Sequence, residues 1–299
     1  MLQKYDKRND DILIYIDGQL LPRAEAKVSV FDSVVQGGDA VWEGIRVYNG
    51  RIFSLEEHLS RLQDSAHAMA FQGIPSSEEV KAALFKTLQA NGMKDDTHIR
   101  LTLTRGLKIT SGMDPRLNQF GPTLIIVPEW KPPVYPPEIT LVTSSVRRNS
   151  PMSLDSKIHH NNLINNILAK IEANHAGADA GLMLDKDGFV SEANGVNVFC
   201  IRKGKVYTPH ADSCLPGITR QHVIHLCQQA GIPILEKNLS LTEFYTADEV
   251  FTTGTMGELT KVVEIDGRQI MNRSGAQVLS QVQALFREMT ETMGEPLPF

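Results

Sequence analysis

The sequence is poor in cysteine and has no long apolar run, and both absences limit what the protein can be. Cys200, Cys214 and Cys227 are an odd set without CxxC spacing, which argues against a disulfide framework or a cysteine-based zinc site and is typical of reduced thiols. No apolar run approaches the ~18 residues of a membrane span. The first ten residues are too polar for a signal peptide. We therefore expect a cytoplasmic protein without a membrane or metal partner.

An excess of basic charge is also missing. The formal net charge is −5, and the basic residues are spread along the chain rather than gathered in a block, which argues against nucleic acid as a partner. An anionic ligand must then be bound by a few local groups. With 299 residues, of which 41% are hydrophobic, the chain is long enough for about two domains with cores of their own.

The first part of the chain alternates strands with helices. Two S-x-x-E capping boxes, Ser54 to Glu57 and Ser76 to Glu79, predict the starts of two helices. Alternation over residues 98–104 predicts a strand with one buried and one polar face. The apolar run at residues 123–127 predicts a more deeply buried strand.

A proline-rich segment separates this part from a second one. Residues 128–137 contain five prolines, so neither a helix nor a sheet should continue through them. We predict a domain of residues 1–127, a linker of residues 128–137 and a domain of residues 138–299. In the second domain we expect helices at about 157–174, 218–230 and 275–292, and hairpin turns at Asp187-Gly188, Lys203-Gly204 and Asp266-Gly267. This pattern indicates an α+β fold.

Lys157 is the most informative single residue. It directly precedes an apolar pattern at helical spacing, which includes Ile164, Ile167 and Ile171, so we expect it near the positive end of a helix dipole. A cation is destabilised there, and a neutral lysine is a nucleophile that forms Schiff bases with carbonyl compounds such as pyridoxal phosphate. The alternative is an ordinary solvated lysine.

Two segments offer what a pyridoxal cofactor needs besides a lysine. Glu192 precedes an apolar strand, where a carboxylate could keep the ring nitrogen protonated. Gly217, Ile218 and Thr219 lie in a Pro-Gly turn that leads into a helix, and the free N–H groups of such a turn bind phosphate. The alternatives are a solvated acid and a plain capped turn.

Further candidates lie elsewhere in the chain. The segment 252–258 offers a second run of hydroxyl and amide groups, among which Thr255 could complete a phosphate site. Arg61 flanks the apolar stripe of the first long helix, where a solvated or ion-paired arginine is the alternative. His159 and His160 lie close to Lys157, but we expect them to be hydrogen-bonded scaffold rather than acid–base catalysts.

Taken in order, these motifs resemble the class IV (fold type IV) pyridoxal phosphate aminotransferases, which include branched-chain aminotransferases, D-amino acid aminotransferases and aminodeoxychorismate lyase. The likeness runs from about Ile14 to Gly267 and is carried by residues 42–50, 58–61, 156–157, 191–194, 215–219 and 253–259. It implies a smaller N-terminal α/β domain and a larger, mainly β C-terminal domain with helices.

The resemblance also implies roles for these residues. Lys157 would be the Schiff-base lysine and proton shuttle, and Glu192 would pair with the ring nitrogen of pyridoxal 5′-phosphate. The phosphate would be bound by Arg61, Gly217, Ile218, Thr219 and Thr255. The substrates would be an amino acid and a 2-oxo acid. The protein would form a homodimer in which the two subunits share their active sites.

The positions that contact substrate in the family do not agree on one substrate class. Asn162 stands where branched-chain enzymes usually have a tyrosine, and Val35 stands where the bacterial D-amino acid enzymes have one. Arg105 is the first candidate for the substrate carboxylate, because its planar fork matches a carboxylate, and Arg100 is the second. Met256 is a further candidate for substrate contact.

Segments 129–135, 155–162 and 253–258 are most similar to a plant-type D-amino acid transaminase branch, often described as branched-chain-aminotransferase-like. The sequence therefore slightly favours a D-amino acid aminotransferase. The alternatives are a branched-chain L-amino acid aminotransferase, an aminodeoxychorismate lyase and a non-catalytic protein that binds pyridoxal phosphate.

Overall fold

The computed structural model describes residues 3–275 and 277–299 and divides into two compact units. The first unit contains residues 3–132, together with Ile158–Asn162 and Thr290–Phe299. The second unit contains Pro133–Lys157 and Leu163–Met289. The chain thus leaves the second unit directly after Lys157 and returns five residues later.

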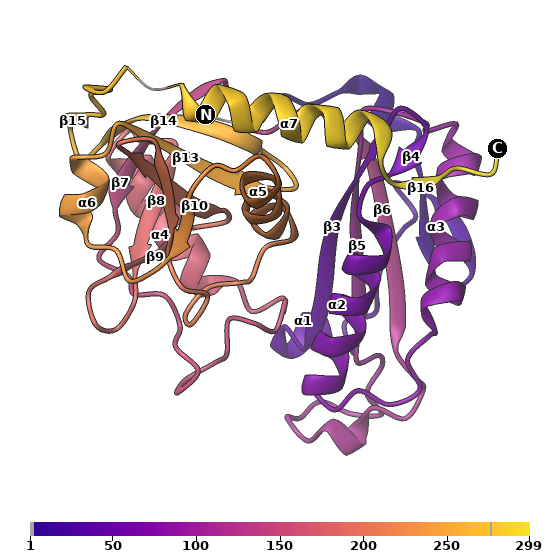
Figure 1. Cartoon of the computed structure of the whole chain (residues 1–299). Coiled ribbons are helices and arrows are strands. Elements are labelled where there is room, and N and C mark those ends of the chain that lie inside the picture. The colour runs from indigo at the N-terminus through magenta and orange to yellow at the C-terminus, as the bar shows by residue number, and fades with distance from the viewer. Residues whose placement is uncertain (1–2, 276) are drawn as a thin grey trace. The chain divides into compact units, whose positions relative to one another are not determined.

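The first unit is built on one antiparallel sheet. In the described part of the chain it has seven strands in the order β16-β4-β3-β5-β6-β1-β2. Their bounds are β1 Leu13–Ile16, β2 Gln19–Pro22, β3 Ala40–Tyr48, β4 Arg51–Ile52, β5 Thr97–Thr104, β6 Thr123–Trp130 and β16 Glu295–Pro296. Helix α2 (Leu55–Ala68) packs on β3, and α3 (Ser77–Asn91) packs on β1 and β6 (Figure 1). Short helices lie at Lys7–Asp10, Ser33–Gly37 (α1) and Pro115–Leu117.

The local predictions for this unit have mixed outcomes. The capping box of Ser76 and Glu79 is confirmed at the start of α3. The box at Ser54 is wrong, because Ser54 has a left-handed backbone with φ of 52° and its side chain makes no cap hydrogen bond to the helix. The strand at 98–104 is confirmed as β5, but both of its faces are mostly buried. It is a central strand, so its polar face is covered as well.

The sheet also continues further than the prolines suggested. Strand β6 runs through Pro128 to Trp130, and Pro128 pairs with Ile99 of β5. On its other side, β6 pairs with β1 only at Ile125 and Ile126. Proline is tolerated where its missing N–H is not needed by a neighbouring strand.

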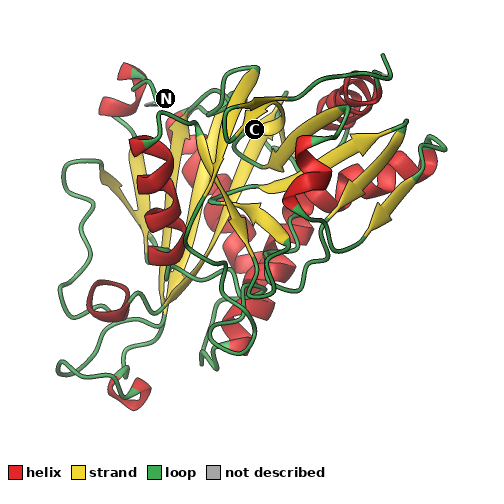
Figure 2. Cartoon of the chain, turned by 90° about the vertical axis from the view of Figure 1, so that its left-hand side faces the viewer, coloured by secondary structure: helices red, strands yellow, loops and turns green. Residues whose placement is uncertain are grey.

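The second unit has a mixed sheet. Its described residues form nine strands, eight of them in the order β12-β11-β10-β13-β14-β7-β8-β9, with β15 paired to β14. The pairs β7–β8, β7–β14 and β11–β12 are parallel. The bounds are β7 Glu138–Thr143, β8 Ala180–Leu184, β9 Val190–Ala193, β10 Asn197–Arg202, β11 Lys205–Thr208, β12 Ile234–Glu236, β13 Glu249–Gly254, β14 Glu258–Ile265 and β15 Arg268–Gln269. Figure 2 shows these strands in yellow and the helices in red.

Four helices accompany this sheet: α4 Ile164–His175, α5 Ile218–Gln229, α6 Leu241–Tyr245 and α7 Val278–Thr292. The predictions of α5 and of the three hairpin turns are confirmed. The predicted helix 275–292 is α7, although position 276 of that prediction lies outside the described residues. The prediction that a helix starts directly after Lys157 is wrong, because α4 begins at Ile164.

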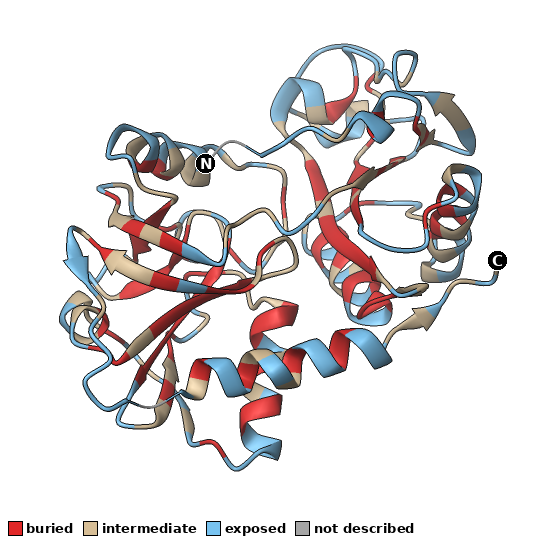
Figure 3. Ribbon diagram, turned by 90° about the horizontal axis from the view of Figure 1, so that it is seen from above, coloured by how far each residue is buried: buried red, intermediate tan, exposed pale blue. Residues whose placement is uncertain are grey.

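Burial follows the sheets in both units. Figure 3 shows the central strands largely in red and the outer sides of most helices in pale blue. The core of the first unit joins β3, β5 and β6 to α2 and α3, and that of the second unit joins β7, β8, β10 and β13 to the segment around α6. Within the described residues, no helix is both long and apolar enough to span a membrane.

Candidate functional site

Lys157 lies in an irregular segment of the second unit, not at a helix end. Its backbone N–H donates to Asp155 Oδ1 at 3.0 Å, and its Nζ lies 3.8 Å from the same oxygen. The side chain is 47% exposed. The next residues are extended against β3 of the first unit, where the Trp42 N–H donates to the His159 carbonyl. The helix-dipole argument therefore does not apply, but the amine is accessible to a ligand.

Glu192 is a buried carboxylate on β9. Its Oε1 accepts a hydrogen bond from Arg148 Nε at 2.5 Å, and its Oε2 accepts one from Asn197 Nδ2 at 3.2 Å. Burial raises the pKa of Glu192 above its ordinary value, while the charge and hydrogen bond of Arg148 act in the opposite direction. Such a group is suited to face a protonated ring nitrogen, because its position is fixed by Arg148 and Asn197 from within the unit.

Asn197 connects Glu192 to the Pro-Gly turn. The same Nδ2 also donates to the Leu215 carbonyl at 2.9 Å. Gly217 is the residue before α5, and a Cβ atom there would lie 2.2 Å from Asn197 Oδ1. Only glycine allows this close approach. Among the described residues no side chain caps α5, so the N–H groups of its first turn, which includes Ile218 and Thr219, are available to bind an anion.

The turn after β13 lies next to the short connection between β9 and β10. The Thr253 hydroxyl is buried and has no hydrogen-bond partner among the described residues. A Cβ atom on Gly254 would lie 2.9 Å from Val196 Cγ1, so this turn packs against the residues that follow Glu192. Thr255 and Met256 are partly buried in the turn, and the Met256 carbonyl accepts from the Val134 N–H at 2.8 Å.

Cys214 is a buried thiol that directly precedes the Leu215–Thr219 turn. Burial raises the pKa of Cys214, and the Glu192 carboxylate adds to this effect. The charges of Arg148, Arg220 and Lys157 act in the opposite direction. Ser156, which precedes Lys157, donates to the Asn149 carbonyl, and the neighbouring Arg148 holds Glu192. Since Asn197 links Glu192 to the Leu215 carbonyl, the second unit brings Lys157 and Glu192 to one region beside the Leu215–Thr219 turn.

Arg61 is held by a buried carboxylate of the first unit. Its Nε and Nη2 donate to Glu43 Oε1 and Oε2 at 2.8 and 2.6 Å. His58 Nδ1 lies 2.7 Å from Oε2, and His159 Nδ1 lies 3.1 Å from Oε1. The pKa of Glu43 is well below its usual range, because these three partners outweigh the opposing effect of burial. The predicted phosphate contact of Arg61 remains a prediction.

The two candidate carboxylate-binding arginines differ in what they already bind. Arg105 makes a two-point contact with Asp39 at 2.6 and 3.1 Å, and it also donates to the carbonyl groups of Met69 and Ala70. A substrate carboxylate would have to displace Asp39.

Arg100 stacks on Trp42, with its guanidinium carbon 3.5 Å from the ring centroid, and donates to Asn161 Oδ1 at 2.8 Å. Burial lowers the pKa of Arg100 to about 10. It forms no ion pair within 4 Å among the described residues, so this guanidinium is the more available of the two.

Val35 and Asn162 lie in neighbouring parts of the first unit. Val35 is exposed on α1, and Gly38 is the C-cap of that helix. A Cβ atom on Gly38 would lie 3.5 Å from Asn162 Nδ2. The substrate roles predicted for Val35, Asn162 and Met256 remain predictions.

Sequence reasoning missed the residues that support the predicted ones. Arg148 and Asn197 hold Glu192, and Glu43 holds Arg61. A buried carboxylate needs a cationic or hydrogen-bonding partner, so the Arg147-Arg148 pair and Asn197 were available as signals. Their pairing with Glu192 is not readable from spacing.

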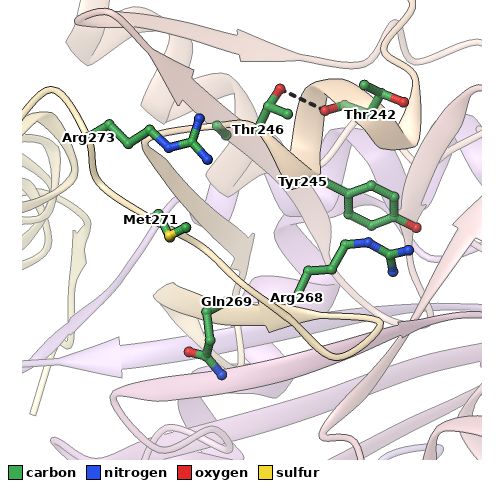
Figure 4. A pocket seen from close by; sticks show the side chains of 8 residues that line it. Thr242, Tyr245, Thr246, Arg268, Gln269, Met271 and Arg273 are labelled. Atoms are coloured by element: carbon green, nitrogen blue, oxygen red, sulfur yellow. Dashed lines mark hydrogen bonds between the residues drawn. The ribbon is translucent and has the colours of Figure 1, made fainter.

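A separate pocket of about 470 Å³ lies between α6 and the segment that follows β14 (Figure 4). Thr242, Tyr245 and Met271 are among the side chains that line it, and none of the predicted site residues does. Its Arg268 stacks on Tyr245 and donates to the Asp266 carbonyl. We assign this pocket no part in the site.

Comparison with known proteins gives consistent matches. The model of the family "Amino-transferase class IV" matches residues 40–265. Branched-chain-amino-acid aminotransferase-like protein 2 of Arabidopsis thaliana is 58% identical over 292 residues, which are 97% of this chain but 52% of that protein. This chain thus spans about half the length of its plant relative. D-alanine aminotransferase of Bacillus licheniformis is 32% identical, over 90% of this chain and 94% of its own.

A solved structure matches over nearly the whole chain. The branched-chain amino acid aminotransferase of Thermobaculum terrenum, solved in its PLP-form (holo-form), has a TM-score of 0.84 and 28% identity, and 95% of each chain is covered.

Proposed function

The chain belongs to the class IV aminotransferases, and we propose that it moves an amino group between an amino acid and a 2-oxo acid with pyridoxal 5′-phosphate as cofactor. The observation that carries this proposal is the arrangement within the second unit. An accessible lysine lies in the same region as a buried carboxylate held by Arg148 and beside a helix N-terminus that no side chain caps.

The residues present fit this cofactor. Glu192 would face the ring nitrogen, and the N–H groups of Ile218 and Thr219 would bind the phosphate with Thr255. The buried Thr253 hydroxyl lacks a partner among the described residues, and an unpaired buried polar group is costly unless a ligand or water satisfies it. Gly217 is needed because Asn197 lies where its Cβ would be.

The chemistry divides between the cofactor and the chain. When bound, the cofactor would supply an aldehyde that takes up the amino group and a ring that withdraws electrons from the reacting carbon. The Lys157 amine would fix the cofactor and then accept the proton from the substrate Cα atom. The Glu192 carboxylate, supported by Arg148 and Asn197, would keep the ring nitrogen protonated. Each role uses a group that is already oriented.

We assign the substrate carboxylate to Arg100 rather than to Arg105. Asp39 already occupies Arg105 in a two-point contact, whereas Arg100 is oriented by stacking on Trp42 and by Asn161. Removing a guanidinium that binds the substrate carboxylate should raise KM more than it lowers kcat. Arg100→Met is therefore expected to raise the KM for the amino donor.

Two donor classes follow from the relatives. D-amino acids were slightly favoured by the sequence, and D-alanine aminotransferase is among the relatives. The engagement of Arg105 by Asp39 removes one support for that preference. Branched-chain L-amino acids are the second class, in line with the names of the plant relative and of the solved structure. Paired D- and L-forms of alanine, leucine, valine and glutamate, with 2-oxoglutarate or pyruvate as acceptor, separate the two.

The test of the proposed activity is the variant Lys157→Ala. The wild type should absorb in the visible range when saturated with pyridoxal phosphate, and borohydride should attach the cofactor to Lys157, as peptide mass analysis can verify. Lys157→Ala should have no measurable transamination. Lys186→Ala, at an exposed lysine of the same unit, is the matched control and should be unaffected. Normal turnover by Lys157→Ala would disprove the proposal.

Two rival activities give different results. A lyase acting on aminodeoxychorismate would release pyruvate without a 2-oxo acid acceptor. A non-catalytic protein would bind the cofactor but would not convert it to its amine form with any donor. The homodimer and the cytoplasmic location stay predictions from the sequence.

A further inference from the structure

Among the described residues, the wall of the pocket between α6 and the segment after β14 contains two arginines and no acidic side chain (Figure 4). Arg268 lies on β15, and Arg273 lies in the segment that follows this strand. Neither guanidinium group forms an ion pair with a carboxylate of the described residues. Two like charges in one pocket repel each other, so the pocket carries positive charge that the chain itself does not compensate.

The neighbouring carboxylates are already used by other donors. The Asp266 carboxylate accepts from the N–H and the hydroxyl of Thr143 at 2.6 and 2.5 Å, and from the Tyr245 hydroxyl at 2.6 Å. The Glu264 carboxylate accepts from the Gln269 amide at 2.5 Å. Neither acid lines the pocket, so a ligand with negative charge would meet the two arginines without a competing carboxylate.

Arg268 is held in place by its own unit. Its guanidinium carbon lies 4.5 Å from the centroid of the Tyr245 ring, and its Nη1 donates to the Asp266 carbonyl at 3.0 Å. The Tyr245 ring is fixed in turn by the bond from its hydroxyl to Asp266. A guanidinium group has five N–H donors, so most of those of Arg268 remain available. A donor that is oriented before binding loses little freedom when a ligand arrives.

Arg273 is anchored through its backbone. The buried Asp248 carboxylate accepts from the Lys203 N–H at 2.7 Å and also from the Arg273 N–H. In Figure 4 the Arg273 guanidinium group points toward Thr246 and lies well apart from that of Arg268. The pocket therefore offers two separate cationic groups, and the Tyr245 ring and the Met271 side chain add an apolar surface.

We propose that this pocket is a binding site for a small organic dicarboxylate. One carboxylate would bind to Arg268 and the other to Arg273, because a guanidinium fork matches a carboxylate in two-point contact. The carbon chain between them would pack on Tyr245 and Met271. The volume of about 470 Å³ lies in the range of small-molecule sites, roughly 300–1,000 Å³. A single phosphate fits less well, because both guanidinium groups would have to meet at one point.

The pocket is separate from the candidate site. The turn with Thr255 and Met256 precedes β14, whereas Arg268 follows it. Strand β14 has 8 residues, and a strand of this length spans roughly 25 Å at about 3.3 Å per residue. None of the residues assigned to the cofactor or to the substrate lines the pocket. The proposed dicarboxylate site therefore does not depend on the proposed chemistry.

The test is the binding of glutarate to the full chain, loaded with pyridoxal phosphate and freed of excess cofactor, by isothermal titration calorimetry in a buffer without phosphate. Glutarate has two carboxylates and no oxo group, so it cannot accept an amino group. Met271→Glu places a competing carboxylate in the pocket and should weaken binding there at least tenfold. Met271→Gln, which has the same length without the charge, is the matched control and should retain the wild-type affinity.

A second comparison removes the arginines themselves. The double variant Arg268→Met with Arg273→Met should bind one glutarate fewer per chain than the wild type, whereas Arg202→Met, at an exposed arginine of β10, should bind as many. Glutarate that binds at the candidate site is common to all these proteins, so the difference between them isolates the pocket. Circular dichroism and urea unfolding verify that each variant is folded.

Two results would overturn the proposal. If the wild type and the double variant bind the same number of glutarate molecules with the same affinity, Arg268 and Arg273 are only solvated side chains. Butyrate has a single carboxylate and should bind in the pocket at least tenfold more weakly than glutarate. If butyrate or inorganic phosphate binds there as tightly as glutarate, the ligand is not a dicarboxylate. None of these measurements depends on transamination.

Discussion

At the scale of single residues, the site depends on buried charges that are paired in advance. Glu192 and Arg148 are both almost fully buried, with side chains 6% exposed. Removing one partner of a buried ion pair destabilises the folded state by more than the intact pair stabilises it. The pair therefore fixes the carboxylate but makes each partner sensitive to loss of the other.

We expect Glu192→Gln to lower the free energy of unfolding by about 3 kcal/mol, because the Arg148 charge is left buried and unpaired. The double variant Arg148→Met with Glu192→Gln should recover at least half of this loss. Urea unfolding of the four proteins measures the coupling. Lys186→Ala, which breaks an exposed pair with Asp187, should leave the free energy of unfolding nearly unchanged. Additive effects of the two buried substitutions would contradict the pairing.

A second prediction at this scale concerns acid stability. Burial lowers the pKa of His159 to about 4, although Glu43 acts in the opposite direction, whereas an unfolded histidine has a pKa of about 6.5. As the pH falls below about 6.5, the unfolded state takes up the proton first. The free energy of unfolding is therefore undiminished above about pH 6.5 and falls as the pH decreases toward 4.

The difference in pKa lowers the free energy of unfolding by about 2 kcal/mol between pH 7 and pH 5. The measurement is urea unfolding at these two pH values. Between pH 7 and pH 5, the free energy of unfolding of His159→Gln should fall by about 2 kcal/mol less than that of the wild type. The exposed His225→Gln should retain the wild-type dependence. An equal pH dependence in all three proteins would exclude His159 as a source.

At the scale of elements, the approach of α5 to β10 shapes the proposed anion site. Gly217 precedes α5 and lies against Asn197, the first residue of β10. Asn197 in turn links Glu192 to the Leu215 carbonyl. The position of the helix N-terminus relative to the carboxylate is thus determined by one glycine and one amide.

We expect Gly217→Ala to weaken cofactor binding at least tenfold, because its Cβ would displace Asn197. Overpacking of this kind also costs about 1–3 kcal/mol of stability. Titration with pyridoxal phosphate, followed by absorbance, measures the affinity. Gly195→Ala is the control, since no atom lies within 4 Å of its added Cβ. Equal affinities of the two variants would show that the close approach is not needed.

At the scale of the whole molecule, each of the two units is built from several separate segments of the chain. The first unit includes Ile158–Asn162 and Thr290–Phe299. The first of these segments pairs with β3 through the His159 carbonyl and the Asn161 N–H, and the second supplies β16, which pairs with β4. The first unit is therefore completed by residues that the chain reaches much later.

We expect a fragment of residues 1–132 to unfold without cooperativity. It lacks both segments, and with them Ile158, Leu297 and Phe299, which pack on the core. Urea unfolding followed by circular dichroism, with the full chain as reference, measures this. A sharp transition comparable to that of the full chain would show that the N-terminal segment is sufficient by itself.

Features that depend on neighbours in sequence were predictable. The Ser76 capping box, the Lys203-Gly204 turn and helix α5 arise from contacts within a few residues or from backbone preferences. The family motifs around Lys157 and Glu192 were readable for the same reason, because each is a short segment. The sequence by itself thus determined the fold class and the family, and it singled out Lys157 and Glu192 as the predicted lysine and carboxylate of the site.

Features that depend on contacts between residues far apart in the sequence could be seen only in the folded structure. Arg148 reaches Glu192 across 44 positions, and Asp39 occupies Arg105 across 66, and no local pattern encodes either pair. The start of α4 was displaced because the residues after Lys157 pair with β3, which local helix propensity cannot anticipate. The helical spacing of Ile164, Ile167 and Ile171 was visible from the beginning. Only the packing of Ala169 on Gly181 determined that this face points away from the core.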